Sequence, residues 1–249
     1  MRLLLYPFTW LMLQAMLLVL GLFSIAWNLA AVVAYPLLSR ERGRHFGRAG
    51  IARGYRWFWR IAGWSGLLRM DARALDAMSH EPGLIVIANH PSMLDAVMLV
   101  ARLPRSFCVM KAGLARNPLL GPAARLARYI RNDSAVGMVR RAVSELKAGG
   151  QLVMFPEGTR TTVPPINAFR PGVTLIAKLA QAPIQAVFID TESPYLGKGW
   201  PLWRLPPLPI VFKVRLGERF APEPDTQALL TRIEAYFAQQ VRVASRPGR

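Results

Sequence analysis

The sequence Leu84-Ile-Val-Ile-Ala-Asn-His-Pro-Ser-Met-Leu-Asp95 decides the fold. Its first five residues are apolar and rich in β-branched side chains, which is typical of a fully buried strand. The next four, Asn89 to Ser92, favour a turn followed by the start of a helix. His90 is therefore expected where a strand ends and a helix begins. In an open α/β sheet this position faces the crevice at the carboxyl end of the strands, where ligands bind.

His90 and Asp95 are candidates for a general base and its orienting carboxylate. They lie five residues apart, about one and a half helical turns, so Asp95 reaches the imidazole if the first turn is irregular. A neutral imidazole, with an ordinary pKa of about 6.5, can take a proton from an alcohol, and a carboxylate on its other nitrogen fixes the tautomer. The nucleophile would then be the substrate's own hydroxyl. The alternative is that the two residues only cap a helix.

A second motif, Phe155-Pro-Glu-Gly-Thr-Arg160, begins 60 residues after Asp95 and ends the apolar run 151–155. With Asn89-His-Pro-Ser-Met-Leu-Asp95 before it, this motif makes the chain resemble the glycerophospholipid acyltransferases, of which lysophosphatidate acyltransferase is the best-known kind. The resemblance covers roughly residues 84–190, with weaker matches at Lys111 and at residues 182–187.

The resemblance implies roles for both motifs. In that family the histidine is the general base and the aspartate orients it, and these roles fall on His90 and Asp95. The loop of the second motif helps to hold the acyl acceptor, often through its phosphate. Acceptor binding is accordingly expected of Glu157, Gly158, Thr159 and Arg160.

The chemistry of this loop agrees with that role. Gly158 allows a backbone with positive φ and a close approach of ligand. The guanidinium of Arg160 can grip a phosphate bidentately. Glu157 is out of place in an anion site unless it positions Arg160 or a neighbouring backbone amide, so we expect an orienting role for it. The alternative for the whole loop is an ordinary turn between a strand and a helix.

Two further cations are implied by the resemblance. Lys111 follows the apolar run 106–110 and matches a position where the family often carries a lysine, although a surface lysine would look the same. Many members carry an arginine that contacts the acceptor phosphate near residues 129–133. Either Arg131 fills this role, or Asn132 stands at that position and a charge-assisted contact is lost. In the second case an acceptor other than lysophosphatidate becomes an option.

Composition points to an anionic partner. The chain has 249 residues, 32 Lys and Arg against 14 Asp and Glu, a net charge of +18 and 53% hydrophobic residues. Such an excess of positive charge suits nucleic acid or a membrane surface. The apolar content favours anionic membrane lipids, and no nucleic-acid partner is expected. With Cys108 as the single cysteine and three histidines, an internal disulfide is excluded and neither a metal site nor a bound cofactor is expected.

The N-terminal region is expected to lie in a membrane. Residues 3–39 contain no charged side chain, far more than the roughly 20 residues that cross a hydrocarbon core. The apolar run is too long for a signal peptide. It fits either one long tilted span or two short helices around residues 21–28, and the resemblance leans towards a two-helix motif.

Arginines and aromatic residues follow this apolar segment. Residues 40–64 contain seven arginines interleaved with Tyr55, Trp57, Phe58, Trp59 and Trp64. Cations next to an apolar segment mark its cytoplasmic side, and aromatic rings suit the headgroup layer. We therefore expect a membrane protein whose catalytic domain lies on the cytoplasmic face. The alternatives are a solvated basic face or a nucleic-acid surface.

The remaining pattern predicts an α/β domain. Apolar runs alternate with helical patterns, which favours a largely parallel or mixed central sheet flanked by helices and preceded by the hydrophobic N-terminal segment. Strands are expected at residues 84–88, 106–111, 151–155, 184–189 and 210–216. The expected organisation is a membrane segment at 1–39, a basic aromatic connector at 40–80, an acyltransferase domain at 81–243 and a basic tail at 244–249.

The expected reaction is direct acyl transfer. His90 would deprotonate an acceptor hydroxyl, and the alkoxide would attack the thioester of acyl-CoA or acyl-carrier protein, with backbone amides or Lys111 stabilising the oxyanion. The expected acceptor is 1-acylglycerol 3-phosphate or a related lysophospholipid. The alternatives are another hydroxylated acceptor, such as glycerol 3-phosphate or an unusual membrane lipid or polyene, and a catalytically inactive membrane-binding protein.

Overall fold

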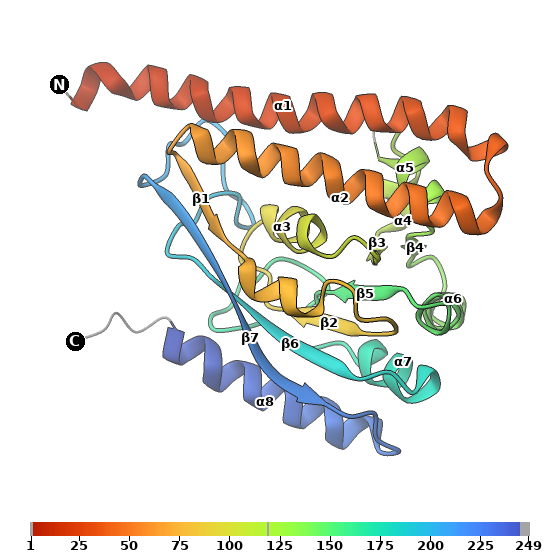
Figure 1. Cartoon of the computed structure of the whole chain (residues 1–249). Coiled ribbons are helices and arrows are strands. Elements are labelled where there is room, and N and C mark those ends of the chain that lie inside the picture. The colour runs from red at the N-terminus through yellow and green to blue at the C-terminus, as the bar shows by residue number, and fades with distance from the viewer. Residues whose placement is uncertain (1, 119, 245–249) are drawn as a thin grey trace.

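A seven-stranded sheet organises the computed structural model, which describes residues 2–118 and 120–244 (Figure 1). The strands lie in the order β1-β7-β6-β2-β5-β3-β4, and all neighbours pair in parallel except β6 and β7. The expected mixed α/β fold is therefore confirmed. The strands are β1 (Leu68–Asp71), β2 (Ile85–Ala88), β3 (Ser106–Met110), β4 (Ile130–Arg131), β5 (Gln151–Met154), β6 (Ile184–Asp190) and β7 (Ile210–Phe220).

The register of the central strands brings the two sequence motifs together. Ile87 in β2 pairs with Met154 in β5, so the turns after these neighbouring strands open at the same edge of the sheet. All four residues of β2 are buried, as expected for a parallel strand covered on both faces. Beyond β2, the Asn89 amide continues the ladder, because its Nδ2 donates to the Ile189 carbonyl and its Oδ1 accepts from the Ile189 N–H.

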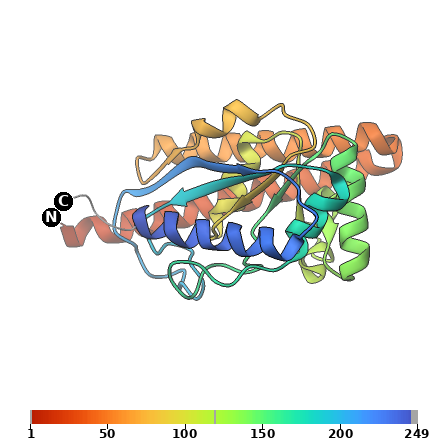
Figure 2. The same cartoon turned by 90° about the horizontal axis from the view of Figure 1, so that it is seen from below.

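Helices cover both faces of the sheet, and the pleat separates two cores. Val86 and Ala88 face the core shared with α2 (Arg40–Trp64) and α3 (Leu94–Arg102), whereas Ile85 and Ile87 face the opposite core. In Figures 1 and 2, α1, α2 and α3 lie on one side of the sheet and α7 and α8 on the other. The helices of the second core are α6 (Ala135–Lys147), α7 (Gly172–Ala180) and α8 (Thr226–Ala244).

The N-terminal region forms one long helix. Helix α1 (Arg2–Leu37) has 36 residues, about 54 Å at about 1.5 Å per residue, and residues 7–37 are long and apolar enough to cross a membrane. A pair of short helices within this segment is not what the structure shows. The two-helix arrangement arises instead from α2, which folds back along α1 after the turn at Ser39 (Figure 1).

Residues 40–80 are part of the fold rather than a connector. Helix α2 packs closely because Gly47 and Gly50 leave no room for a side chain, and a Cβ at Gly47 would lie 2.6 Å from the Ala127 nitrogen. Strand β1 then joins the sheet beside β7, and a 3-10 turn, η1 (Arg73–Met78), follows. Because β1 contains the charged residues Arg69 and Asp71, no run of apolar residues marks it as a strand in the sequence.

The other expected elements are present with small shifts in their ends. Strand β7 extends to Phe220, and the short edge strand β4 lies where no strand was expected. Two short helices, α4 (Ala112–Ala115) and α5 (Gly121–Leu126), separate β3 from β4. Of the expected tail, residue 244 ends α8, and residues 245–249 lie outside the described part of the chain.

Candidate active site

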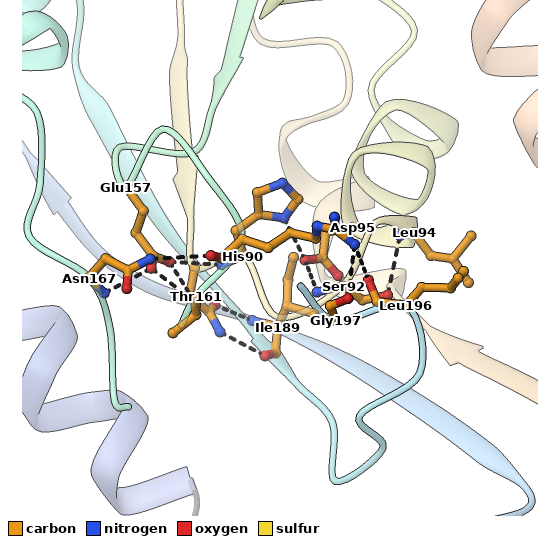
Figure 3. Close-up of polar contacts among 12 residues, drawn as sticks. His90, Ser92, Leu94, Asp95, Glu157, Thr161, Asn167, Ile189, Leu196 and Gly197 are labelled. Atoms are coloured by element: carbon orange, nitrogen blue, oxygen red, sulfur yellow. Dashed lines mark hydrogen bonds and ion pairs between the residues drawn. The ribbon is translucent and has the colours of Figure 1, made fainter. Parts of the chain in front are cut away.

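His90 and Asp95 form the expected pair (Figure 3). Nδ1 of His90 lies 2.9 Å from Oδ2 of Asp95. The Ser92 N–H also donates to this oxygen, at 2.8 Å, so the turn before α3 brings the carboxylate under the imidazole. Asp95 is fully buried, and burial raises the pKa of its carboxyl to about 6, against the opposing hydrogen bonds from His90 and Ser92.

The imidazole of His90 stacks against one aromatic ring, and its Nε2 atom remains without a protein partner among the described residues. Its ring stacks on Phe155, with centroids 3.9 Å apart and planes tilted by 16°. The side chain of His90 is 17% exposed, and among the described residues its Nε2 has no hydrogen-bond partner. With Nδ1 on the carboxylate, Nε2 is the atom left to exchange a proton with a substrate.

Glu157 joins the two motifs. It is 3% exposed, and its Oε1 accepts the backbone N–H of His90 at 3.0 Å. The same carboxylate accepts the Thr161 hydroxyl and the Asn167 N–H at 2.8 Å each. Figure 3 shows this cluster on one side of His90 and Asp95 on the other. Glu157 was expected to position either Arg160 or a neighbouring backbone amide. It accepts from a backbone amide, and this amide belongs to His90, the candidate base.

The other residues of the second motif hold the loop. Gly158 has φ of +69°, and a Cβ there would lie 2.6 Å from Nε of Arg170. Arg160 donates through Nη1 to the carbonyls of Leu196 and Gly197, at 2.8 and 3.0 Å. Its guanidinium thus ties the loop after β6 to the site, a contact that the sequence did not indicate. Thr159 is half-buried in the same turn.

Lys111 and Arg131 lie further along the sheet. Lys111 is exposed at the end of β3, with β5 between it and β2. Arg131 lies in β4, three strands from β2, which is on the order of 14 Å, and it pairs with Asp133 at 3.1 Å. Asn132 accepts the Ala112 N–H through Oδ1. No contact joins Lys111 or Arg131 to His90 or Glu157 within the described residues.

Several site residues were missed by sequence reasoning. Asn89 and Ser92 looked like ordinary turn formers, yet the first aligns the turn with β6 and the second holds both Asp95 and the Tyr195 carbonyl. Thr161 and Asn167 lie beyond the motif, and only their distance from Glu157 reveals them. Their sole sequence signal is that polar residues cluster after a buried strand.

Cys108 is poorly suited to act as a covalent nucleophile. Burial raises the pKa of the Cys108 thiol to about 12, so the thiolate needed for nucleophilic attack is scarce at neutral pH. In the described part of the chain, no three His, Cys, Asp or Glu side chains come together as a metal site would require. The arrangement at His90 suits base catalysis on a bound hydroxyl.

Known proteins resemble the chain in sequence and fold. A family model described as Acyltransferase matches residues 69–190. The chain is 31% identical over 136 residues to a 1-acyl-sn-glycerol-3-phosphate acyltransferase of Limnanthes douglasii, covering 52% of this chain and 48% of that protein. It is 28% identical over 151 residues to a lyso-ornithine lipid O-acyltransferase of Pseudomonas aeruginosa, covering 56% and 58%. The chain thus spans about half the length of these curated relatives.

A solved structure shares the fold. The 1-acyl-sn-glycerophosphate acyltransferase PlsC of Thermotoga maritima superposes with a TM-score of 0.67 at 21% identity, over 93% of this chain and 98% of that one. This likeness shows a common fold, and the matched family model covers just under half of the chain. Over residues 69–190 the chain is similar to the acyltransferase family, and both sequence motifs lie within this matched region.

Proposed function

We propose that the protein is a membrane-bound O-acyltransferase that moves a fatty acyl group from a thioester donor to the free hydroxyl of 1-acylglycerol 3-phosphate or a related lysophospholipid. The observation that carries this proposal is the His90–Asp95 pair, with Nδ1 on a buried carboxylate and Nε2 open. The match of residues 69–190 to a family model described as Acyltransferase supports the reaction class.

The chemistry begins with proton transfer to His90. Nε2 takes the proton of the acceptor hydroxyl while Asp95 stabilises the imidazolium that forms. The alkoxide oxygen attacks the thioester carbonyl and forms a tetrahedral intermediate. Collapse breaks the carbon–sulfur bond, and the thiolate of CoA or acyl-carrier protein leaves with the proton from Nε2. Backbone amides or Lys111 would stabilise the oxyanion, and the loop 157–160 would support acceptor binding.

The outer surface of α1 and α2 supports membrane binding. Large apolar side chains on one face of α1 are exposed, namely Phe8, Leu11, Leu18, Leu22, Ile25, Leu29, Val32 and Val33. Trp57 and Trp64 on α2 are exposed beside Arg53, Arg56 and Arg60. Apolar and cationic aromatic surfaces next to each other suit the hydrocarbon and headgroup layers of an anionic leaflet. The arginines next to the apolar helix favour the cytoplasmic face for the catalytic domain.

The decisive experiment measures acyl transfer by purified protein in lipid, from labelled acyl-CoA and acyl-carrier protein to a panel of lysophospholipids. We expect His90→Ala to lower kcat/KM by about 10² to 10⁴ or more, because general base catalysis contributes this much. Thermal unfolding and membrane binding should not change. His80→Ala, an exposed histidine outside the site, is the matched control. A loss below about tenfold for His90→Ala would remove this residue as the base.

A different acceptor within the same chemistry is the second candidate. Two arginines expected to bind the acceptor phosphate already have partners within the protein, and this favours such an acceptor. Arg160 donates to backbone carbonyls, and Arg131 pairs with Asp133. The acceptor panel therefore includes glycerol 3-phosphate and lysolipids without a phosphate monoester. If only these added acceptors are acylated, the proposed reaction class stands, and the proposed acceptor changes from 1-acylglycerol 3-phosphate to one of them.

A further inference from the structure

A cleft of about 490 Å³ opens beside the proposed catalytic base. Its lining includes Pro91 of the first motif, Thr161 just after the second motif, and the loop after β6. Pro91 follows His90 directly, and the Thr161 N–H donates to the His90 carbonyl at 2.8 Å. The remaining wall includes Glu192, Lys198, Trp200 and Arg204. A group bound in this cleft would thus lie against the turn that carries His90, and neither the imidazole nor its stacking partner Phe155 lines the cleft.

The loop that builds this cleft is anchored on three sides. The Ser92 hydroxyl donates to the Tyr195 carbonyl at 3.0 Å, and Arg160 donates to the next two carbonyls. Tyr195 and Leu196 are buried. Further along, the Gln14 side chain on α1 donates to the Leu202 carbonyl at 2.8 Å. The cleft is therefore preformed, and its wall is tied to the helix proposed to enter the membrane.

Unpaired charges of both signs line the cleft. Glu192 and Lys198 are exposed, and neither forms an ion pair or side-chain hydrogen bond within the described residues. Arg204 has its guanidinium 5.1 Å above the Trp200 ring, which orients the cation without neutralising it. Several acidic side chains elsewhere on the fold are paired, as Asp133, Asp190 and Glu223 are. The cleft therefore gathers one anionic and two cationic side chains that a ligand carrying both signs of charge can pair with.

From this geometry we infer that the cleft binds the head group of the acyl acceptor and selects one that carries an anion and a cationic nitrogen together. This inference rests on the proposed acyl transfer and deepens it. Lys198 and Arg204 would pair with the anion, and Glu192 with the nitrogen. A phosphate monoester offers only negative charge, so Glu192 would repel it. The required chemistry occurs in phosphodiester lysolipids with an amine and in lysolipids built on an amino acid.

The test compares three acceptors with the same labelled donor: lysophosphatidylethanolamine, a lyso-ornithine lipid and lysophosphatidate. We expect Glu192→Gln to lower kcat/KM about fivefold for the two zwitterionic acceptors and to raise it for lysophosphatidate. Lys198→Ala should raise the acceptor KM for all three and leave the donor KM unchanged. The preferred zwitterion identifies the anion as a phosphodiester or a carboxylate.

Matched substitutions outside the cleft separate specific from general charge effects. Glu218→Gln and Lys147→Ala change the same charges at exposed positions on β7 and α6, and we expect no change in acceptor selectivity. If Glu192→Gln alters all three acceptors by one common factor, or none of them, the head-group assignment is overturned while acyl transfer stands. If the unmodified protein acylates no lysolipid, the proposed function itself fails and the head-group assignment fails with it.

Discussion

Asp95 is fully buried, although the role proposed for it requires negative charge. Only one of its oxygens is satisfied, because Oδ2 accepts from both His90 and Ser92 whereas Oδ1 is buried without a partner among the described residues. Burial accordingly raises the pKa of this carboxyl from 3.8 to about 6. An uncompensated buried carboxylate costs stability. The buried Asp95 carboxylate is therefore a feature that packing alone would disfavour. Its presence fits the proposal that Asp95 orients His90.

This raised pKa predicts how stability depends on pH. The folded chain binds the Asp95 proton more tightly than the unfolded chain, so this group lowers the free energy of unfolding as the pH rises from 3.8 to about 6. Asp95→Asn removes the titration. We expect the melting temperature of the variant, relative to the unmodified protein, to rise across this window, while kcat falls about 10² to 10⁴. A difference in melting temperature that does not vary with pH would contradict the pKa assignment.

At the scale of elements, the loop after β6 depends on Arg160. Its guanidinium holds two successive carbonyls, and Arg160→Ala would release this loop from the turn after β5. We expect the acceptor KM to rise by a similar factor for lysophosphatidate and for zwitterionic lysolipids, because the lost contact is to the backbone and not to a phosphate. Steady-state kinetics with both acceptors measure this. A loss confined to lysophosphatidate would instead make Arg160 a direct phosphate ligand.

Helices α2 and α6 are joined by a buried ion pair. Arg48 Nη2 lies 2.5 Å from Glu145 Oε2, and Arg48 Nε also donates to the Ala127 carbonyl. Arg48→Met would leave the Glu145 carboxylate buried, and we expect a loss of about 3 kcal/mol in the free energy of unfolding. Adding Glu145→Leu should recover most of it, as measured by denaturation. Equal instability of the single and double variants would show that the pair is not what joins these helices.

At the scale of the whole molecule, α1 presents an apolar face that nothing in the described chain covers. Leu18 and Leu22 are 63% and 54% exposed on this face. Leu18→Glu with Leu22→Glu places two charges there, and each charge costs a few kcal/mol in a hydrocarbon layer. We expect binding to anionic vesicles in a flotation assay to be strongly reduced, with the melting temperature unchanged. Glu replacement of the exposed Leu179 on α7 is the matched control. Unchanged flotation would exclude this face of α1 from membrane contact.

Much of the fold and of the candidate site could be predicted from local sequence patterns. The apolar runs at β2, β5 and β6 are short and fully or mostly buried, and the run at β3 is partly buried, so their composition alone indicates strands. Strand β1 escaped this reasoning because only Leu68 in it is buried. The packing of α2 against the rest of the fold was also not predictable from local sequence. Its buried Arg48 pairs with Glu145, which lies 97 positions away in the chain.

The sequence by itself determined that a histidine follows one buried strand, that an aspartate follows it by five residues, and that a Glu-Gly-Thr-Arg turn follows another buried strand. These are local features, set by side-chain type and by the chemistry of turns. Only the tertiary structure decided that β2 and β5 are neighbours, that Glu157 holds the His90 backbone and that Arg160 holds the loop bearing Glu192 and Lys198. Each of these contacts joins residues far apart in the chain, so it follows from strand order and packing, which no local pattern encodes.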